Sequence, residues 1–149
     1  MIPKNEMDQR VVQMMERMCF VLVDPMDEDH GAAANHRANI DFWGDQCRGN
    51  VSIEASDGFL LEVASSLLGL EPEDLDDSDC SAAIKELANM TCGELLELMG
   101  AEDKTLHCGL PEDGAWSSDS TPLLLKSAFD SMGEVFRIAV QVKECKETE

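Results

Sequence analysis

Residues 78–100 have the hydrophobic pattern of a long amphipathic helix. At 100° per residue, the core-type residues of this segment fall on one side, as in a helix that packs against a core. Ser78 is the expected N-cap, and the acidic residues before it favour the positive end of the helix. The residues expected on the buried side are Ile84, Leu87, Ala88, Thr91, Leu95 and Leu98.

Two earlier segments also have helical spacing. The first covers residues 7–22, with Asn5 as the expected cap and Asp24-Pro25 as the expected stop. The second begins after the expected cap Ser56 and ends at Gly69, a residue type that favours helix C-termini. The pattern therefore predicts three helices, of which 7–22 and 78–100 are the longest.

Alternation of apolar and polar residues predicts strands in the remaining segments. The expected strands cover residues 39–43, 50–55, 105–110, 123–129 and 134–142. Gly44 and Gly49 separate the first two, which indicates an antiparallel hairpin, and residues 130–133 separate the last two. The prediction is a single α+β domain over residues 1–149, in which a mostly antiparallel sheet carries the two long helices.

The solvent side of the 78–100 helix carries Glu86, Asn89 and Gly93. Glu86 and Asn89 are three residues apart, so they stand one turn apart, roughly 4.5 Å along the axis. Asparagine is a poor residue for a helix centre, and a glycine there costs about 1 kcal/mol relative to alanine. Two explanations stay open: tolerated surface variation, or a docking surface that another protein's backbone can approach.

Charge narrows the classes of partner. The chain has 149 residues, with 11 basic and 31 acidic residues and a formal net charge of −20 at pH 7. We expect so acidic a chain to bind neither nucleic acid nor an anionic membrane surface. No apolar run approaches the roughly 20 residues of a transmembrane helix, and no signal-peptide pattern is visible. The sequence therefore predicts a cytoplasmic protein.

Metal-ligating residue types are present without a metal-binding pattern. A calcium loop starting at Asp74 would have Asp79 in place of glycine and Lys85 in place of glutamate. His30 and His36 lack a third ligand at matching spacing. We therefore expect no metal site, and in a cytoplasmic chain no disulfide. The six cysteines stand singly, at positions 19, 47, 80, 92, 108 and 145.

The run ELANMTCGEL, with Glu86, Asn89, Met90 and Gly93, resembles the signature helix of the CheX/CheC/FliY phosphatases, which act on phosphorylated CheY in bacterial chemotaxis. In that family a proline follows the asparagine by some twenty-odd residues, and Pro111 stands in that place. The longer run AAIKELANMTCGEL carries more of the resemblance than a bare Glu-x-x-Asn. A single copy of the motif resembles CheX rather than the two-copy CheC form.

The resemblance implies a CheC-like fold and a phosphatase for the phospho-aspartate of a CheY-like response regulator. In that reaction Asn89 would orient the attacking water and Glu86 would pair with a lysine of the partner. Met90, Gly93 and Pro111 would contact the partner. The resemblance implies no cofactor in this chain, magnesium in the partner's active site, and a homodimer joined through sheet edges.

One residue departs from the family pattern, and two other functions stay open. Ala82 stands four residues before Glu86, where the family usually has Asp or Ser, so helix capping or a supporting hydrogen bond could differ. The chain has no P-loop, no Gly-x-Ser-x-Gly and no Cys/His nucleophile pattern, so it lacks a self-contained active site. The alternatives are a non-catalytic adaptor for a response regulator or flagellar switch, and an acidic metal buffer.

Overall fold

Seven strands form one antiparallel sheet in the computed structural model of the chain, which describes residues 3–45, 47–100, 105–114 and 122–145. The strand order is β1-β6-β7-β3-β2-β4, and β5 also pairs with β2. The strands are β1 (Asp24–Pro25), β2 (His36–Trp43), β3 (Cys47–Ala55), β4 (His107–Cys108), β5 (Glu112–Asp113), β6 (Leu123–Ser131) and β7 (Glu134–Cys145).

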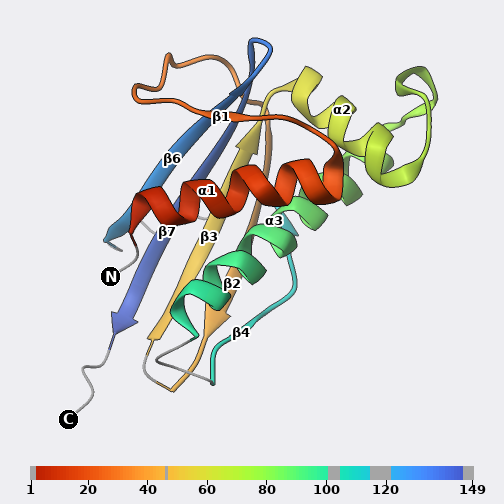
Figure 1. Ribbon diagram of the computed structural model, residues 1–149. Helices are drawn as coiled ribbons and strands as arrows, with labels where there is room; N and C mark the ends of the chain where they lie inside the picture. Colours follow the sequence, from red (N-terminus) through yellow and green to blue (C-terminus); the bar gives the residue numbers. More distant parts are fainter. Residues whose placement is uncertain (1–2, 46, 101–104, 115–121, 146–149) are drawn as a thin grey trace.

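The helices lie on one face of this sheet (Figure 1). This arrangement confirms the predicted α+β class with a mostly antiparallel sheet, while the extent of the domain over residues 1–149 stays a prediction. The helices are α1 (Lys4–Met14), which continues as the π-helix η1 (Met15–Cys19), α2 (Asp57–Leu68), the 3-10 helix η2 (Pro72–Asp74) and α3 (Asp77–Met99).

Strand alternation explains why the sheet has one apolar and one polar face. Ile53 pairs with Ile138 across β3 and β7, and both side chains are buried under the helices. Glu54 and Arg137, one position along each strand, pair on the opposite face. The core therefore lies between the sheet and the helices. Its largest fully buried side chains are Phe42, Phe59, Phe129, Phe136, Met7, Met14, Met15, Ile40, Ile53, Leu60, Leu87 and Leu95.

The first helix differs from its prediction at both ends. It begins at Lys4, because Pro3 occupies the N-cap position, so the expected cap Asn5 lies inside the helix. Proline suits a helix start because it has no N–H to leave unpaired. The helical run ends at Cys19 rather than residue 22, since Phe20 adopts the left-handed conformation. Val21 and Val23, in the irregular segment that follows, are then buried.

The caps of the other helices were predicted with mixed success. Gly69 ends α2 in the left-handed conformation as expected. Ser56 is the N-cap residue of α2, but its hydroxyl donates to Glu134 and accepts from the Val135 N–H instead of capping. The prediction of Ser78 as the cap of α3 is wrong, because Asp76 and Asp79 form a reciprocal capping box.

The predicted strands are present with different lengths. Both expected hairpins form, and the β6–β7 turn has positive φ at Met132 and Gly133. The expected strand at 105–110 is reduced to β4, because the chain bulges at 109–111 before it pairs with β2 again as β5. Pro111 cannot donate a ladder hydrogen bond, so the interruption falls where a continuous strand would be costly.

Candidate functional site

The exposed side of α3 carries the residues that the sequence singled out. Glu86, Asn89 and Gly93 are all exposed, while Leu87 and Ala88 between them are fully buried. The predicted division of this helix into a buried and a solvent side is confirmed. Leu98, at the end of the expected stripe, is only half-buried.

Glu86 and Asn89 have no side-chain hydrogen bond or ion pair with another residue in the part of the chain that the structure describes. Lys85, the sequence neighbour that could have neutralised Glu86, instead places its Nζ 3.7 Å from Asp113 Oδ2. The acid and the amide therefore face solvent with their donors and acceptors available. An exposed, unpaired asparagine in a helix centre has no structural reason within the described chain.

Gly93 and Met90 differ in their surroundings. A Cβ built on Gly93 would meet no atom within 4 Å, so the glycine is not required by packing inside this chain. Its backbone is therefore open to a close approach from outside. Met90 is half-buried and packs against the core, so only part of its side chain is available to a partner.

The segment that contains Pro111 runs along one flank of α3. Ser81 Oγ donates to Asp113 at 2.8 Å, and Cys92 and Cys108 hydrogen-bond through their thiols. These two contacts bracket half-buried Pro111 beside the middle of α3, where Glu86 and Asn89 lie. The structure thus brings the expected proline to the same region as the acid–amide pair.

Ion pairs fasten α1 to the other flank of α3, and sequence reasoning missed them. Arg10 Nη1 donates to Glu97 Oε2 at 2.7 Å and to Glu94 Oε2 at 3.2 Å. Arg17 Nη2 lies 3.7 Å from Glu94 Oε1. A search for opposite charges on the outer sides of two amphipathic helices could have suggested these pairs, but not their geometry. They fix α1 beside the C-terminal half of α3.

The thiols near the site have perturbed acidities. Burial, together with the charge of Glu86, raises the pKa of Cys19 to about 11. The hydrogen bond between Cys92 and Cys108 raises the pKa of Cys92, which is also buried, and lowers the pKa of Cys108. Cys19, Cys80, Cys92 and Cys108 are reduced thiols.

Ala82 is exposed on the first half of α3. The helix is capped at Asp76 and Asp79, so an alanine at position 82 does not affect the capping. Ser81, the residue before it, already links α3 to Asp113.

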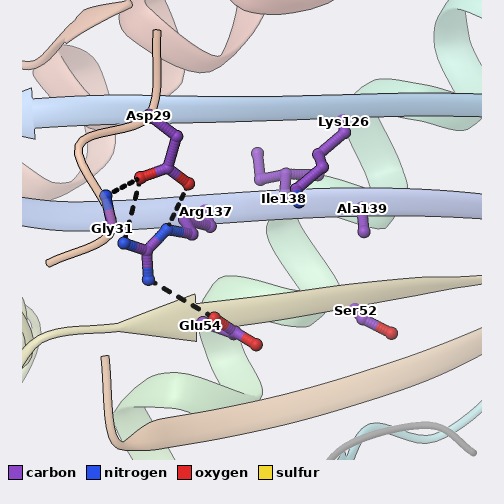
Figure 2. A pocket seen from close by; sticks show the side chains of 8 residues that line it. All are labelled: Asp29, Gly31, Ser52, Glu54, Lys126, Arg137, Ile138 and Ala139. Atoms are coloured by element: carbon purple, nitrogen blue, oxygen red, sulfur yellow. Dashed lines mark hydrogen bonds and ion pairs between the residues drawn. The ribbon is translucent and has the colours of Figure 1, made fainter. Parts of the chain in front are cut away.

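A hollow of about 310 Å³ lies on the sheet face opposite the helices (Figure 2). Its main charged group, Arg137, donates from Nε to Asp29 Oδ2 at 2.6 Å and lies 3.5 Å from Glu54 Oε2. Arg137 lowers the pKa of Asp29. The charges in this hollow therefore neutralise one another, and they hold the loop before β2 against the sheet.

Metal-ligand geometry is also absent from the described residues, which contain no group of three His, Cys, Asp or Glu side chains placed to hold a metal ion. His36 instead lies 2.9 Å from Asp57 Oδ1. None of the described helices combines the length and apolar character needed to cross a bilayer.

The fold and the acid–amide pair define an α+β protein whose longest described helix presents an acid and an amide to solvent. The sequence profile described as "Chemotaxis phosphatase CheX" matches residues 37–112, which include Glu86, Asn89 and Pro111. The chain belongs to this CheX family. No curated protein sequence matches it significantly.

Solved structures of similar fold include CheX proteins and a FliM domain. CheX from Vibrio vulnificus has 19% identity and a TM-score of 0.74, covering 93% of this chain and 94% of that chain. The CheX–CheY–BeF3–Mg²⁺ complex from Borrelia burgdorferi has 17% identity and a TM-score of 0.73, covering 97% and 100%. The middle domain of FliM from H. pylori has 10% identity and a TM-score of 0.61, covering 93% and 86%. These likenesses establish the CheC-like fold.

Proposed function

We propose that this chain is a phosphatase for the phospho-aspartate of a CheY-like receiver domain. One observation carries the proposal: Glu86 and Asn89 stand one turn apart on a rigid helix, exposed and free of partners among the described residues. Membership of the CheX family supports the proposal, as does the CheX–CheY complex formed by a protein of the same fold.

Hydrolysis of an aspartyl phosphate requires a water placed in line with the phosphorus and charge held in position. The attacking water forms a bond to phosphorus while the bond to the aspartyl oxygen breaks, leaving a free carboxylate and inorganic phosphate. The receiver domain supplies the phospho-aspartate, a lysine and the magnesium ion. This chain has only to complete that site, so it needs no cofactor of its own.

Asn89 is the catalytic residue of this proposal. Its carboxamide oxygen accepts a hydrogen bond from the attacking water while its amide nitrogen donates one, and neither group titrates near neutral pH. The helix supplies the rigidity, because α3 is capped by Asp76 and Asp79 and buries its opposite side in the core. A preorganised group gains more rate than a mobile one.

Glu86 pairs with the lysine of the receiver domain and thereby sets the depth of docking. An ionised carboxylate and an ammonium group form a charge-assisted hydrogen bond, which is stronger and shorter than a neutral one. Gly93 allows the partner's backbone to approach α3, while Met90 and Pro111 contribute apolar contacts at the border of the site.

The deciding experiment measures turnover. Purified protein is added in less than stoichiometric amount to a panel of phosphorylated receiver domains, and release of phosphate is followed with time. We expect each molecule of this chain to dephosphorylate many receivers. Binding or protection of the phosphorylated form without turnover would instead identify an adaptor.

We also propose that the chain works in the cytoplasm, where receiver domains are phosphorylated, and that it dimerises through a sheet edge. The outer edge of β6 pairs with the two-residue β1 only near Phe129 and Asp130. Exposed backbone groups on an edge strand are a common site of strand addition. Sedimentation velocity of the purified chain tests the dimer, and a single monomeric species over the micromolar range would reject it.

A further inference from the structure

The segment that follows α1 exposes three large apolar side chains. Met18 is 50% exposed, Phe20 81% and Leu22 72%. We refer to Met18, Phe20 and Leu22 as the α1-end cluster. Isolated exposed hydrophobic residues are common, whereas grouped ones are typical of interaction sites.

The backbone of this segment is unusual. Residues Met15–Cys19 form a π-helix, a rare conformation that is frequent at functional sites. Phe20 follows with φ 56° and ψ 31°, in the left-handed region that disfavours bulky residues. Met132, the other non-glycine residue with positive φ among those described, lies in the β6–β7 turn, where the tight hairpin requires this conformation. No hairpin requires it at Phe20.

The exposed side chains are held by buried neighbours. Cys19, Val21 and Val23 are at most 3% exposed, and they alternate with Phe20 and Leu22. Burial of Cys19, Val21 and Val23 fixes the backbone of this segment, which holds Phe20 and Leu22 at the surface. The cluster is therefore preorganised, which lowers the entropy lost on binding.

The cluster adjoins the acid–amide pair. Glu86 is close enough to Cys19 for its charge to raise the pKa of that thiol, and Cys19 immediately precedes Phe20. Figure 1 shows the end of α1 beside α3, and Arg17 joins it to Glu94 on that helix. Phe20 also borders a hollow of about 550 Å³ with a polar rim. The rim residues are Gln13, Glu16 and Arg17.

We infer that the α1-end cluster is the surface by which this chain selects its receiver domain, with Phe20 as the apolar anchor beside the Glu86–Asn89 pair. The inference rests on the proposed function. Two observations select this occupant. The segment that carries the cluster is paired to α3, the helix of the proposed catalytic residues, and its aromatic anchor with an arginine-bearing rim has the composition of a protein interface. The dimer that we propose joins through the sheet edge at β6, which leaves the α1-end cluster available to a receiver domain.

The test separates recognition from catalysis. Phe20→Asn removes the ring but tolerates the left-handed backbone, because asparagine adopts this conformation readily. Met132→Asn is the matched control, since it also replaces a large exposed apolar side chain by asparagine at a left-handed position. Thermal melts of both variants verify folding. Affinity is then measured by calorimetry with a panel of receiver domains activated by beryllofluoride, and turnover with the phosphorylated domains.

We expect Phe20→Asn to weaken binding of the preferred receiver by about tenfold or more. Its kcat at saturating receiver should equal that of the wild type. The differences in affinity between the receiver domains of the panel should become smaller. Met132→Asn should change neither quantity. Unchanged affinity in Phe20→Asn, or an equal loss in the Met132 control, would overturn the inference.

Other outcomes distinguish this inference from the proposed function. If Phe20→Asn binds normally while Asn89→Ala loses turnover, the cluster is not the selecting surface and the phosphatase proposal stands. If Phe20→Asn binds weakly while Asn89→Ala keeps full turnover, the role of the α1-end cluster in receiver selection is supported and the catalytic role of Asn89 is rejected. If the wild type binds no receiver in the panel, both are overturned. Dissociation of a homodimer by Phe20→Asn, with receiver binding unchanged, would assign the cluster to self-association and overturn the inference.

Discussion

Lys85 Nζ lies 3.7 Å from Asp113 Oδ2, while Glu86, the next residue along α3, pairs with no residue that the structure describes. Ser81 binds the same aspartate, so this flank of the helix is tied to β5. The effect is to hold Pro111 near α3 without neutralising Glu86. Lys85 therefore makes a structural contact within the chain, whereas Glu86 is available to a partner.

Asn89→Ala should fold normally and lose most of the phosphatase activity. The side chain is exposed and unpaired among the described residues, so its removal should leave the melting temperature within error of the wild type. Loss of the group that orients water should lower kcat on the order of a hundredfold. Phosphate release under saturating receiver measures the effect, and near-wild-type turnover would reject the catalytic role of Asn89.

Glu86→Lys should weaken the complex with the receiver domain through charge reversal at the proposed lysine contact. Glu62→Lys, on the exposed part of α2, makes the same change in net charge and serves as the control. The loss of affinity should be greater at low salt than at high salt, because ions screen exposed charges. Equal affinities for the Glu86 and Glu62 variants would exclude a specific contact at Glu86.

Substitution of Gly93 by alanine should stabilise the fold, whereas substitution by a large side chain should weaken binding of the partner. Gly93→Ala should raise the free energy of unfolding by about 0.5–1 kcal/mol, because the site is helical and has space for a methyl group. Gly93→Gln should fold equally well but hinder the approach of the partner's backbone and raise the Kd. Denaturant unfolding and calorimetry check the two effects, and a glutamine variant with wild-type affinity would show that no partner approaches Gly93.

Cys19 should make the fold less stable at alkaline pH. Its folded pKa of about 11 lies above the ordinary value of 9, so the folded state holds the proton more tightly than the unfolded state. This contribution is complete below pH 9 and is lost as the pH rises towards 11. The free energy of unfolding of wild type should therefore fall more steeply from pH 9 to 11 than that of Cys19→Ala. Parallel pH dependences of the two free energies would contradict the raised pKa of Cys19.

Cys108 should be alkylated before Cys19 at pH 8. Its pKa is lowered by the hydrogen bond from Cys92 and it is half-buried, whereas Cys19 is buried with a raised pKa. The thiolate is the reactive form, so the order of labelling follows the pKa values and the exposure. Peptide mass spectrometry after brief iodoacetamide treatment gives the order directly, and earlier labelling of Cys19 would disprove it.

Local periodicity predicted most of the elements but few of their ends. The alternation around Ile138 and the helical spacing around Leu87 identified buried residues correctly, because both signals repeat within one element. The cap of α3 was misplaced because Ser78, Asp76 and Asp79 are all acceptable caps, and only the reciprocal pair of hydrogen bonds selects between them. The π-helix before Phe20 has no comparable periodic signal.

By itself the sequence determined which side of α3 would be buried and that Glu86 and Asn89 would share the other side, because residues three apart on a helix always face the same way. The tertiary structure decided what surrounds that pair. Arg10 and Glu97 are separated by 87 positions in the chain and yet form an ion pair. Contacts of this kind leave no local pattern, since they depend on how two helices cross over the sheet. The same packing places the α1-end cluster beside the acid–amide pair, and this proximity cannot be predicted from either segment alone.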